Sequence, residues 1–200
     1  MLKGLLLFFL LIPDNGGTRP YNFLITVNST LVTITGKTNV NRFVCDLERE
    51  GLKQSMQVMS TYEDDTLRFD GLRLAFPIKE FDCGLEVLNS DFYDFLMGDV
   101  YPEMFIDIDH MVIKREGSLM EKVSVVSEVG IQLCGKEKNY TLPKGYVMEL
   151  PENTIKLVSE ENVRFTDFGM IPPTKFFGTI KVYDELEIAF EVDLKVEAVK

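Results

Sequence analysis

The stretch that decides the fold is VYDELEIAFEVDLKV, residues 182–196. Every second residue from Leu186 to Val196 is apolar, and Val182 lies on the same face if the chain is extended. The residues between them are mostly acidic or basic. A period of two is typical of a strand with one face in a protein core and the other in water. The stretch therefore predicts a long strand with one wet side and one dry side.

Similar alternation occurs at four other places along the chain, at residues 31–35, 72–78, 104–108 and 123–133. Turn-forming residues lie between or beside these runs: Asp70-Gly71, Glu116-Gly117, Cys134-Gly135, Pro143-Lys144-Gly145 and Pro172-Pro173. Several strands at this spacing are typical of a closed barrel or a sandwich. No linker or repeat interrupts the pattern, so we expect an all-β domain.

One segment has helical spacing instead. Residues 89–98, NSDFYDFLMG, begin with a helix-capping asparagine and end with a glycine. Phe92, Phe95 and Leu96 fall on one side of such a helix. We expect a short amphipathic helix from Asn89 that lies over a sheet or closes the mouth of a barrel.

The first residues have the composition of an export signal. Lys3 precedes the apolar run Gly4–Ile12, which is too short to span a bilayer as a helix but has the length of a signal-peptide core. We expect residues 1–17 to be a signal peptide and residues 18–200 to be the mature domain. The protein would then be periplasmic or secreted. The alternative is that the apolar run forms a buried N-terminal strand.

Length and charge exclude several classes of function. Two hundred residues, 46% of them apolar, fit one domain with its own core. The chain carries 21 basic and 32 acidic residues, a net charge of −11, which repels the phosphates of nucleic acids and of anionic lipids. We therefore expect no nucleic-acid partner and no stable insertion into a membrane.

Catalytic and metal-binding motifs are scarce. Residues 167–169, DFG, match the magnesium-binding tripeptide of protein kinases, but the other kinase motifs are missing. Residues 107–110, DIDH, resemble a metal cluster. On a regular strand, however, Asp107 and Asp109 point to one side while His110 points to the other with the isoleucines. We expect no metal site and no catalytic residue.

The three cysteines suggest one disulfide. Cys45 and Cys83 both lie near the ends of expected strands, and an exported protein meets oxidising conditions. We expect these two to pair and Cys134 to remain a small apolar residue. Three buried free thiols are the alternative.

Three blocks of sequence resemble a known family. Residues 167–185, DFGMIPPTKFFGTIKVYDE, are similar to the C-terminal signature of the YceI-like family, which is also called the lipid/polyisoprenoid-binding family. Residues 29–45, STLVTITGKTNVNRFVC, resemble its opening strand pair, in the variant with an N-V-x-x-F-x-C pattern. Residues 81–102, from FDCG to YP, resemble its D-C-G block with a short helix. Together the blocks cover most of the chain after residue 21.

The resemblance implies an extended, antiparallel, lipocalin-like β-barrel of about eight strands with one short helix. It also implies non-catalytic binding and carrying of an isoprenoid or other amphiphilic lipid, because a barrel of this size can enclose one small ligand. The bound molecule would be an isoprenoid quinone, a polyprenyl lipid or a fatty amphiphile, with no other cofactor. We expect the following apolar side chains to line it: Leu74, Phe76, Phe92, Leu96, Met104, Ile106, Ile108, Val123, Val125, Ile131, Leu186, Ile188 and Phe190.

Two other functions stay open. An isomerase or cyclase could use the barrel as a chamber for a hydrophobic substrate, but it would need ionisable groups inside, and only His110 is a candidate. A fully packed barrel could instead serve as an interaction module with no ligand. The residues leave open the identity of the ligand, whether the barrel is hollow or filled, and the oligomeric state, a homodimer included.

Overall fold

The computed structural model describes residues 20–50, 54–119, 122–175 and 178–199. The expected signal peptide, residues 1–17, lies outside the described residues. The strands are β1 (Tyr21–Thr38), β2 (Arg42–Glu50), β3 (Ser55–Glu63), β4 (Thr66–Asp70), β5 (Arg73–Pro77), β6 (Glu103–Leu119), β7 (Lys122–Leu133), β8 (Lys136–Leu150), β9 (Thr154–Arg164), β10 (Thr174–Lys175) and β11 (Ile180–Ala198). The helices are α2 (Glu86–Phe95) and the 3-10 turns η1 (Ile78–Glu80) and η2 (Phe165–Phe168).

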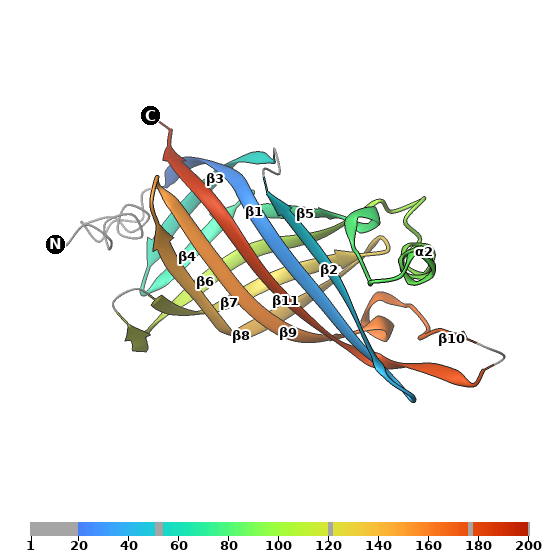
Figure 1. Cartoon of the computed structure of the whole chain (residues 1–200). Helices are drawn as coiled ribbons and strands as arrows, with labels where there is room; N and C mark the ends of the chain where they lie inside the picture. Colours follow the sequence, from blue (N-terminus) through green and yellow to red (C-terminus); the bar gives the residue numbers. More distant parts are fainter. Residues whose placement is uncertain (1–19, 51–53, 120–121, 176–177, 200) are drawn as a thin grey trace.

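The strands close into an antiparallel barrel (Figure 1). Around the ring the order is β1, β11, β9, β8, β7, β6, β4 and β3, and β3 returns to β1. Strand β2 continues β3 along the edge of β1, and β5 continues β4 along β6, so the wall has eight positions. The expected all-β barrel with a short helix is confirmed.

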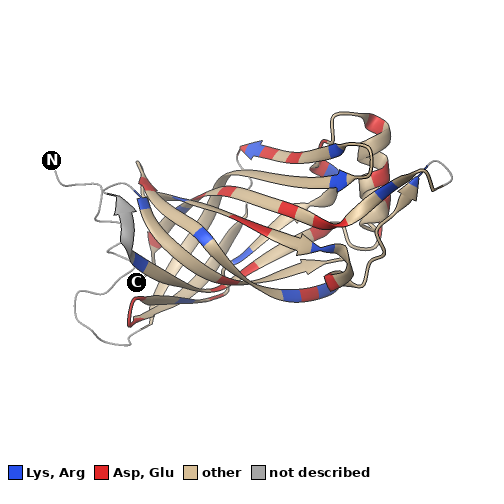
Figure 2. Ribbon diagram, turned by 90° about the horizontal axis from the view of Figure 1, so that it is seen from below, with Lys and Arg blue, Asp and Glu red and all other residues tan. Residues whose placement is uncertain are grey.

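The alternation in β11 explains how the wall forms. Leu186, Ile188, Phe190, Val192, Leu194 and Val196 are all buried on the inner face. The charged residues between them are exposed or half-buried, and Figure 2 marks the positions of the charged residues along the strands. This strand pairs along most of its length with β1 on one side and with β9 on the other.

The wall consists of two half-sheets. We call β9, β11, β1 and β2/β3 the first half-sheet, and β4/β5, β6, β7 and β8 the second. Two ladders of five residue pairs each, β3–β4 and β8–β9, are all that joins them by regular pairing among the described residues. Both ladders lie at the end of the barrel where β1 starts and β11 stops, which we call the termini end (Figure 1).

At the opposite end, the helix end, the half-sheets diverge. The segment η1–α2, inserted between β5 and β6, fills the gap beside β2. The turn η2 follows β9 and lies beside β8, where Phe168 stacks near Tyr140. No helix within the described part of the chain is long and apolar enough to cross a bilayer.

The helix starts earlier than its sequence predicted. It begins at Glu86, with Leu85 as the extended residue before it, so Asn89 lies inside the helix. The Asn89 side chain instead bonds to the preceding turn, where its Oδ1 accepts from the Cys83 amide at 2.6 Å. The expected glycine stop is close to correct, because the Gly98 amide donates to the Tyr93 carbonyl.

Two of the expected turns are not turns. Strand β6 continues through Glu116-Gly117 to Leu119. Strand β8 continues through Pro143-Lys144, which form a bulge: Leu142 pairs with Ser127 and Gly145 with Val125. Proline is tolerated at such a position because it has no amide hydrogen to contribute to a ladder. By contrast, Cys134-Gly135 is a tight hairpin turn with positive φ at both residues.

Candidate functional site

The barrel interior is one continuous apolar cluster. It extends from Phe23 near the termini end to Phe92 of helix α2. Twelve of the thirteen expected lining residues are fully buried in it, and Val123 is partly buried against it. Because the buried members are at most 9% exposed, the interior in this structure is filled by its own side chains. Their contact with a ligand stays a prediction.

Four hydroxyl groups interrupt the apolar interior. Thr30, Ser60, Ser127 and Ser159 are 1–3% exposed, and their hydroxyls have no hydrogen-bond partner among the described residues. A buried polar group without a partner is rare, because it costs about 1–3 kcal/mol. The sequence contained a signal for them, since each hydroxyl residue occupies an inward position of an alternating strand.

Helix α2 closes the helix end, one of the two placements that we expected for it. The Phe92 ring lies 5.6 Å from that of Phe81, and the Phe95 ring meets Phe165 edge-on at 4.9 Å. The Cys134 thiol donates to the Leu96 carbonyl at 3.1 Å. Burial raises the pKa of this thiol to about 11, so it stays protonated at neutral pH. Cys134 is therefore the buried, free residue that we expected.

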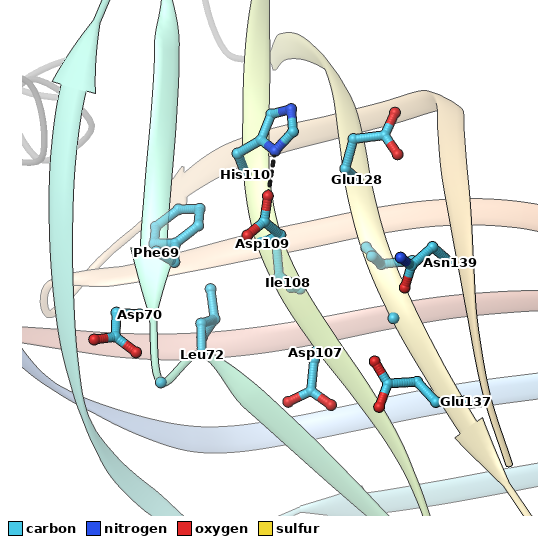
Figure 3. A pocket seen from close by; sticks show the side chains of 13 residues that line it. Phe69, Asp70, Leu72, Asp107, Ile108, Asp109, His110, Glu128, Glu137 and Asn139 are labelled. Carbon is cyan, nitrogen blue, oxygen red and sulfur yellow. Dashed lines mark hydrogen bonds and ion pairs between the residues drawn. The ribbon is translucent and has the colours of Figure 1, made fainter.

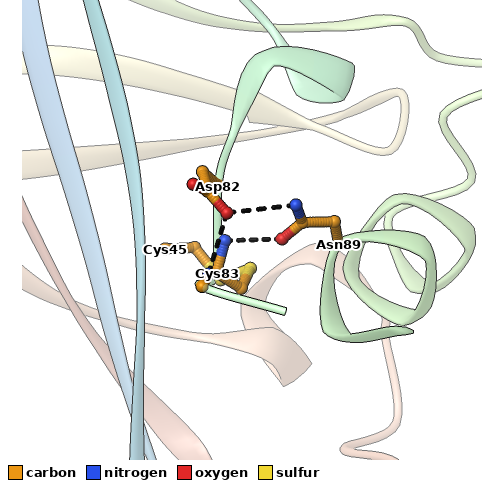
Figure 4. Close-up of a disulfide and its surroundings, with 5 residues drawn as sticks. Cys45, Asp82, Cys83 and Asn89 are labelled. Atoms are coloured by element: carbon orange, nitrogen blue, oxygen red, sulfur yellow. Dashed lines mark hydrogen bonds between the residues drawn. A yellow bond between two sulfur atoms is a disulfide. The ribbon is translucent and has the colours of Figure 1, made fainter. Parts of the chain in front are cut away.

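The gap between β2 and β5 is closed without a ladder. Cys45 and Cys83 form the expected disulfide across it (Figure 4). Beside the disulfide, Asp46 and Asp82 exchange two backbone hydrogen bonds at 2.9 and 2.8 Å. Arg49 also forms an ion pair with Glu80. This side of the barrel is therefore fixed covalently.

A side chain takes the place of a strand in the same gap. The Gln54 amide donates from Nε2 to the Arg73 carbonyl at 2.8 Å, and its Oε1 accepts from the Ala75 amide at 3.2 Å. These are the two bonds that a neighbouring strand would supply to β5. The seam between β2 and β5 is therefore linked from end to end.

The DIDH motif does not form the arrangement that a regular strand predicts. The register between β6 and β7 shifts between Ile108 and His110. This bulge places Asp109 and His110 both on the outer side, where His110 Nδ1 and Asp109 Oδ2 lie 2.6 Å apart. The expectation that His110 shares the inward face of Ile106 is therefore wrong, because a bulge adds one residue and reverses the faces.

His110 lies beside an outer hollow of about 460 Å³ (Figure 3). Besides His110, its ionisable lining residues are all acidic: Asp70, Asp107, Asp109, Glu128 and Glu137. Burial raises the pKa of Asp107, Arg73 opposes the rise, and Glu137 adds to it. Within the described residues, no group of three or more histidine, cysteine or carboxylate side chains is placed to hold a metal ion.

Within the described residues, the fully buried polar side chains are threonines and serines, with no carboxylate, amine or imidazole among them. General acid–base catalysis needs such groups within hydrogen-bonding reach of a substrate. The interior can therefore surround a hydrocarbon chain and offer hydroxyl hydrogen bonds.

Comparisons with known proteins support the fold. No protein-family model and no curated protein matches the chain. Among solved structures, it is similar to a polyisoprenoid binding domain from Saccharophagus degradans (TM-score 0.58, 8% identity, 88% of this chain and 98% of that chain). It is also similar to BcnA of Burkholderia cenocepacia (0.47, 17%, 82% and 95%) and to a YCEI protein of Campylobacter jejuni (0.45, 16%, 66% and 74%). The chain shares the barrel fold of the polyisoprenoid binding domain.

Proposed function

We propose that the protein binds an amphiphilic lipid, an isoprenoid or similar chain, between the two half-sheets and carries it unchanged. The observation that carries the proposal is the set of four unpartnered hydroxyls in an otherwise apolar interior. A permanently packed core gains nothing from such groups, because alanine or valine would fill the same positions without the desolvation cost. A ligand with both hydrocarbon and oxygen atoms suits both parts of this surface.

The architecture supports the proposal as well. A filled interior must expand to accept a ligand, and two half-sheets joined by five-pair ladders at one end can separate at the other. The similarity in fold to a domain described as polyisoprenoid binding is consistent with a long hydrocarbon ligand. The lack of buried acids and bases among the described residues favours a carrier over an enzyme.

A packed interaction module is the second candidate, and the filled interior favours it. The two functions predict different contents for the purified protein. An organic extract of protein from its native host, analysed by mass spectrometry, should contain about one lipid per barrel if the protein is a carrier. No lipid in the extract, and no binding of an added twenty-carbon prenol, would support the interaction module.

A matched pair of variants tests the site. Ile106 is 1% exposed and lies between Leu74 and Ile131 on neighbouring strands. Ile106→Phe adds a ring to the interior and should abolish retention of the prenol. Val112→Phe adds a ring to the outer side of the same strand and should leave retention unchanged. Equal retention by both variants would contradict binding in the interior.

We also propose export to the periplasm or outside the cell. The support is the Cys45–Cys83 disulfide, since structural disulfides persist in oxidising compartments. Intact-mass analysis of protein from its native host should show the loss of about the first 17 residues. A full-length species in the cytoplasm as the main form would contradict it.

A further inference from the structure

The seam between β8 and β9 is open along half its length. The two strands pair from Leu150↔Thr154 to Tyr146↔Val158, and their ladder ends there. Figure 1 shows the two strands diverging from this point toward the helix end. Beyond it, no backbone hydrogen bond within the described chain joins residues 136–145 of β8 to residues 159–164 of β9. The backbone groups that face the seam therefore have no strand partner.

Within the described chain, contacts that involve side chains hold this part of the seam. Lys144 of β8 and Glu160 of β9 form an exposed ion pair at 3.4 Å. Closer to the helix end, the Tyr140 hydroxyl donates to Asp167 Oδ2 at 2.8 Å, and its ring lies against Phe168. An exposed ion pair contributes little to stability, and a single neutral–charged hydrogen bond is also weak compared with a ladder. Both contacts can break while the barrel stays folded.

A hollow of about 400 Å³ lies at the point where the ladder ends. Outer-face residues such as Leu31 and Tyr146 line it, and so do Ser159 and Phe190 of the inner face. Ser159 carries one of the four unpartnered hydroxyls. The Ser159 hydroxyl itself is buried, so the hollow lies on the outer side of the wall, directly beside the unpaired seam and the residue that carries this hydroxyl.

The opposite seam differs in one decisive respect. Between β2 and β5 the disulfide, the Asp46–Asp82 backbone pair and the Gln54 side chain fasten the two half-sheets. Of the two seams at the helix end, only the one between β8 and β9 can separate without breaking a covalent bond.

We propose that the amphiphile enters and leaves through the β8–β9 seam, with the 400 Å³ hollow as its outer vestibule. This inference rests on the proposed lipid binding. The hydrocarbon tail passes between residues 136–145 and 159–164, and the Ser159 hydroxyl donates a hydrogen bond to an oxygen of the ligand. The charged side chains of the vestibule are Lys144, Glu160 and Glu191. One cation and two anions disfavour a phosphate head group, so the ligand is an uncharged one, such as a long-chain alcohol or ketone.

A cross-link across the seam tests this route. The ligand-free variant Lys144→Cys/Glu160→Cys is joined across the seam with a short bis-maleimide. Its uptake of geranylgeraniol is then compared with uptake by the same variant without the cross-link. Cross-linking should slow uptake of the alcohol by at least about tenfold, because the seam can no longer separate. Cys134 does not compete for the reagent, because its buried thiol stays protonated.

The matched control lies one strand away on β8. Glu128 and Thr141 are exposed cross-strand partners on β7 and β8, and their side chains are hydrogen-bonded at 2.6 Å. The variant Glu128→Cys/Thr141→Cys, joined with the same reagent, spans a continuous ladder and should take up the alcohol at the wild-type rate. Slowing of equal size in both proteins would overturn the inference.

A second variant avoids cross-linking. Tyr140→Phe removes the hydrogen bond to Asp167 and should speed release of the alcohol by about fivefold. Tyr183→Phe, at an exposed position, should not change release. Unchanged rates after cross-linking and in Tyr140→Phe, with binding intact, would overturn this route and leave lipid binding standing. Faster uptake after reduction of the native disulfide alone would place the route at the other seam. Absence of binding in the wild-type protein would overturn both proposals.

Discussion

Ser127 is a polar residue at an inward-facing position of strand β7. Its neighbours at alternate positions, Val125 and Val129, are buried and apolar, and its own hydroxyl has no partner. Ser127→Ala removes the desolvation cost and should raise the free energy of unfolding by about 1 kcal/mol. Urea denaturation measures the change.

Ser29 provides the control for Ser127. Its hydroxyl donates to Asp193 Oδ2 at 2.8 Å. Ser29→Ala removes this hydrogen bond and should therefore lower the free energy of unfolding. A loss of stability in Ser127→Ala comparable to that in Ser29→Ala would mean that the Ser127 hydroxyl does have a partner in solution.

Asp82 makes stability depend on pH in the acid range. The Gly84 amide and the Asn89 side chain donate to its ionised carboxylate and lower its pKa from the ordinary value of 3.8. The unfolded chain therefore binds the proton more readily than the folded one. The resulting stability is present above the ordinary pKa and is lost as the pH falls through the lower folded value. Urea melts from about pH 5 to pH 2 should show a steeper loss for the wild type than for Asp82→Asn.

Asn89→Ala tests the same linkage from the donor side. The variant keeps the carboxylate and the Gly84 amide but removes one of the two donors, so its acid-range slope should fall between those of the wild type and Asp82→Asn. A slope equal to that of the wild type would contradict the role of Asn89.

The DIDH motif shows why single residues are hard to place from sequence. The alternation of β6 correctly predicts that Ile106 and Ile108 face inward, since each step of the pattern is local. The bulge before His110 is set by the register with β7, which involves residues about twenty positions away in the chain. Nothing in residues 107–110 themselves reveals that shift. Ser127 is different, because its inward position follows from the alternation of its own strand, between Val125 and Val129.

At the scale of the elements, the Cys45–Cys83 disulfide is the strongest link across the β2–β5 seam. The cross-link joins residues separated by 38 positions, and on the loop-entropy model a loop of this size is worth about 4 kcal/mol. Replacing both cysteines by serine should lower the free energy of unfolding by about that amount.

Cys134→Ala is the control for the disulfide variant. It removes the free thiol without affecting a cross-link and should cost clearly less in urea denaturation. Equal losses of unfolding free energy in the two variants would contradict a stabilising role of the disulfide.

Elements themselves were largely predictable, and their exact ends were not. The alternation identified inward-facing positions in β5, β6, β7 and β11, because the period of two depends only on neighbouring residues. The start of α2 was misplaced because the Asn89 side chain caps the turn at Cys83 rather than the helix. Pro143 looked like a turn, yet it lies in a bulge at the place where β8 leaves β9.

At the scale of the whole molecule, the barrel consists of two half-sheets that ladders join at the termini end and that the disulfide joins on the β2–β5 side. Where a ladder stops depends on registers accumulated around all eight positions of the wall, so the two seams without a full ladder could not be predicted from any one stretch of sequence. The disulfide was predicted, but its position at one of these seams was not.

Hydrogen exchange should reveal this architecture. The seam-facing amides of residues 159–164 have no strand partner toward β8, whereas β11 is paired on both sides from Leu186 to Lys195. Amides bonded within continuous ladders open only with larger unfolding events. Site-resolved exchange measured by NMR should therefore be faster at alternate residues of 159–164 than anywhere in 186–194. Uniform protection across both segments would mean that the half-sheets are more tightly joined than their ladders indicate.

The first and last strands leave the barrel side by side. Phe23 pairs with Ala198, and the Val199 amide donates to the Asn22 carbonyl at 2.9 Å. A segment attached before β1 or after β11 is therefore attached at the termini end in either case. A tether to a surface, or a fused domain, would fix the barrel at that end. Helix α2 and the diverging half of the β8–β9 seam would then face away from the anchor, toward whatever approaches from solution.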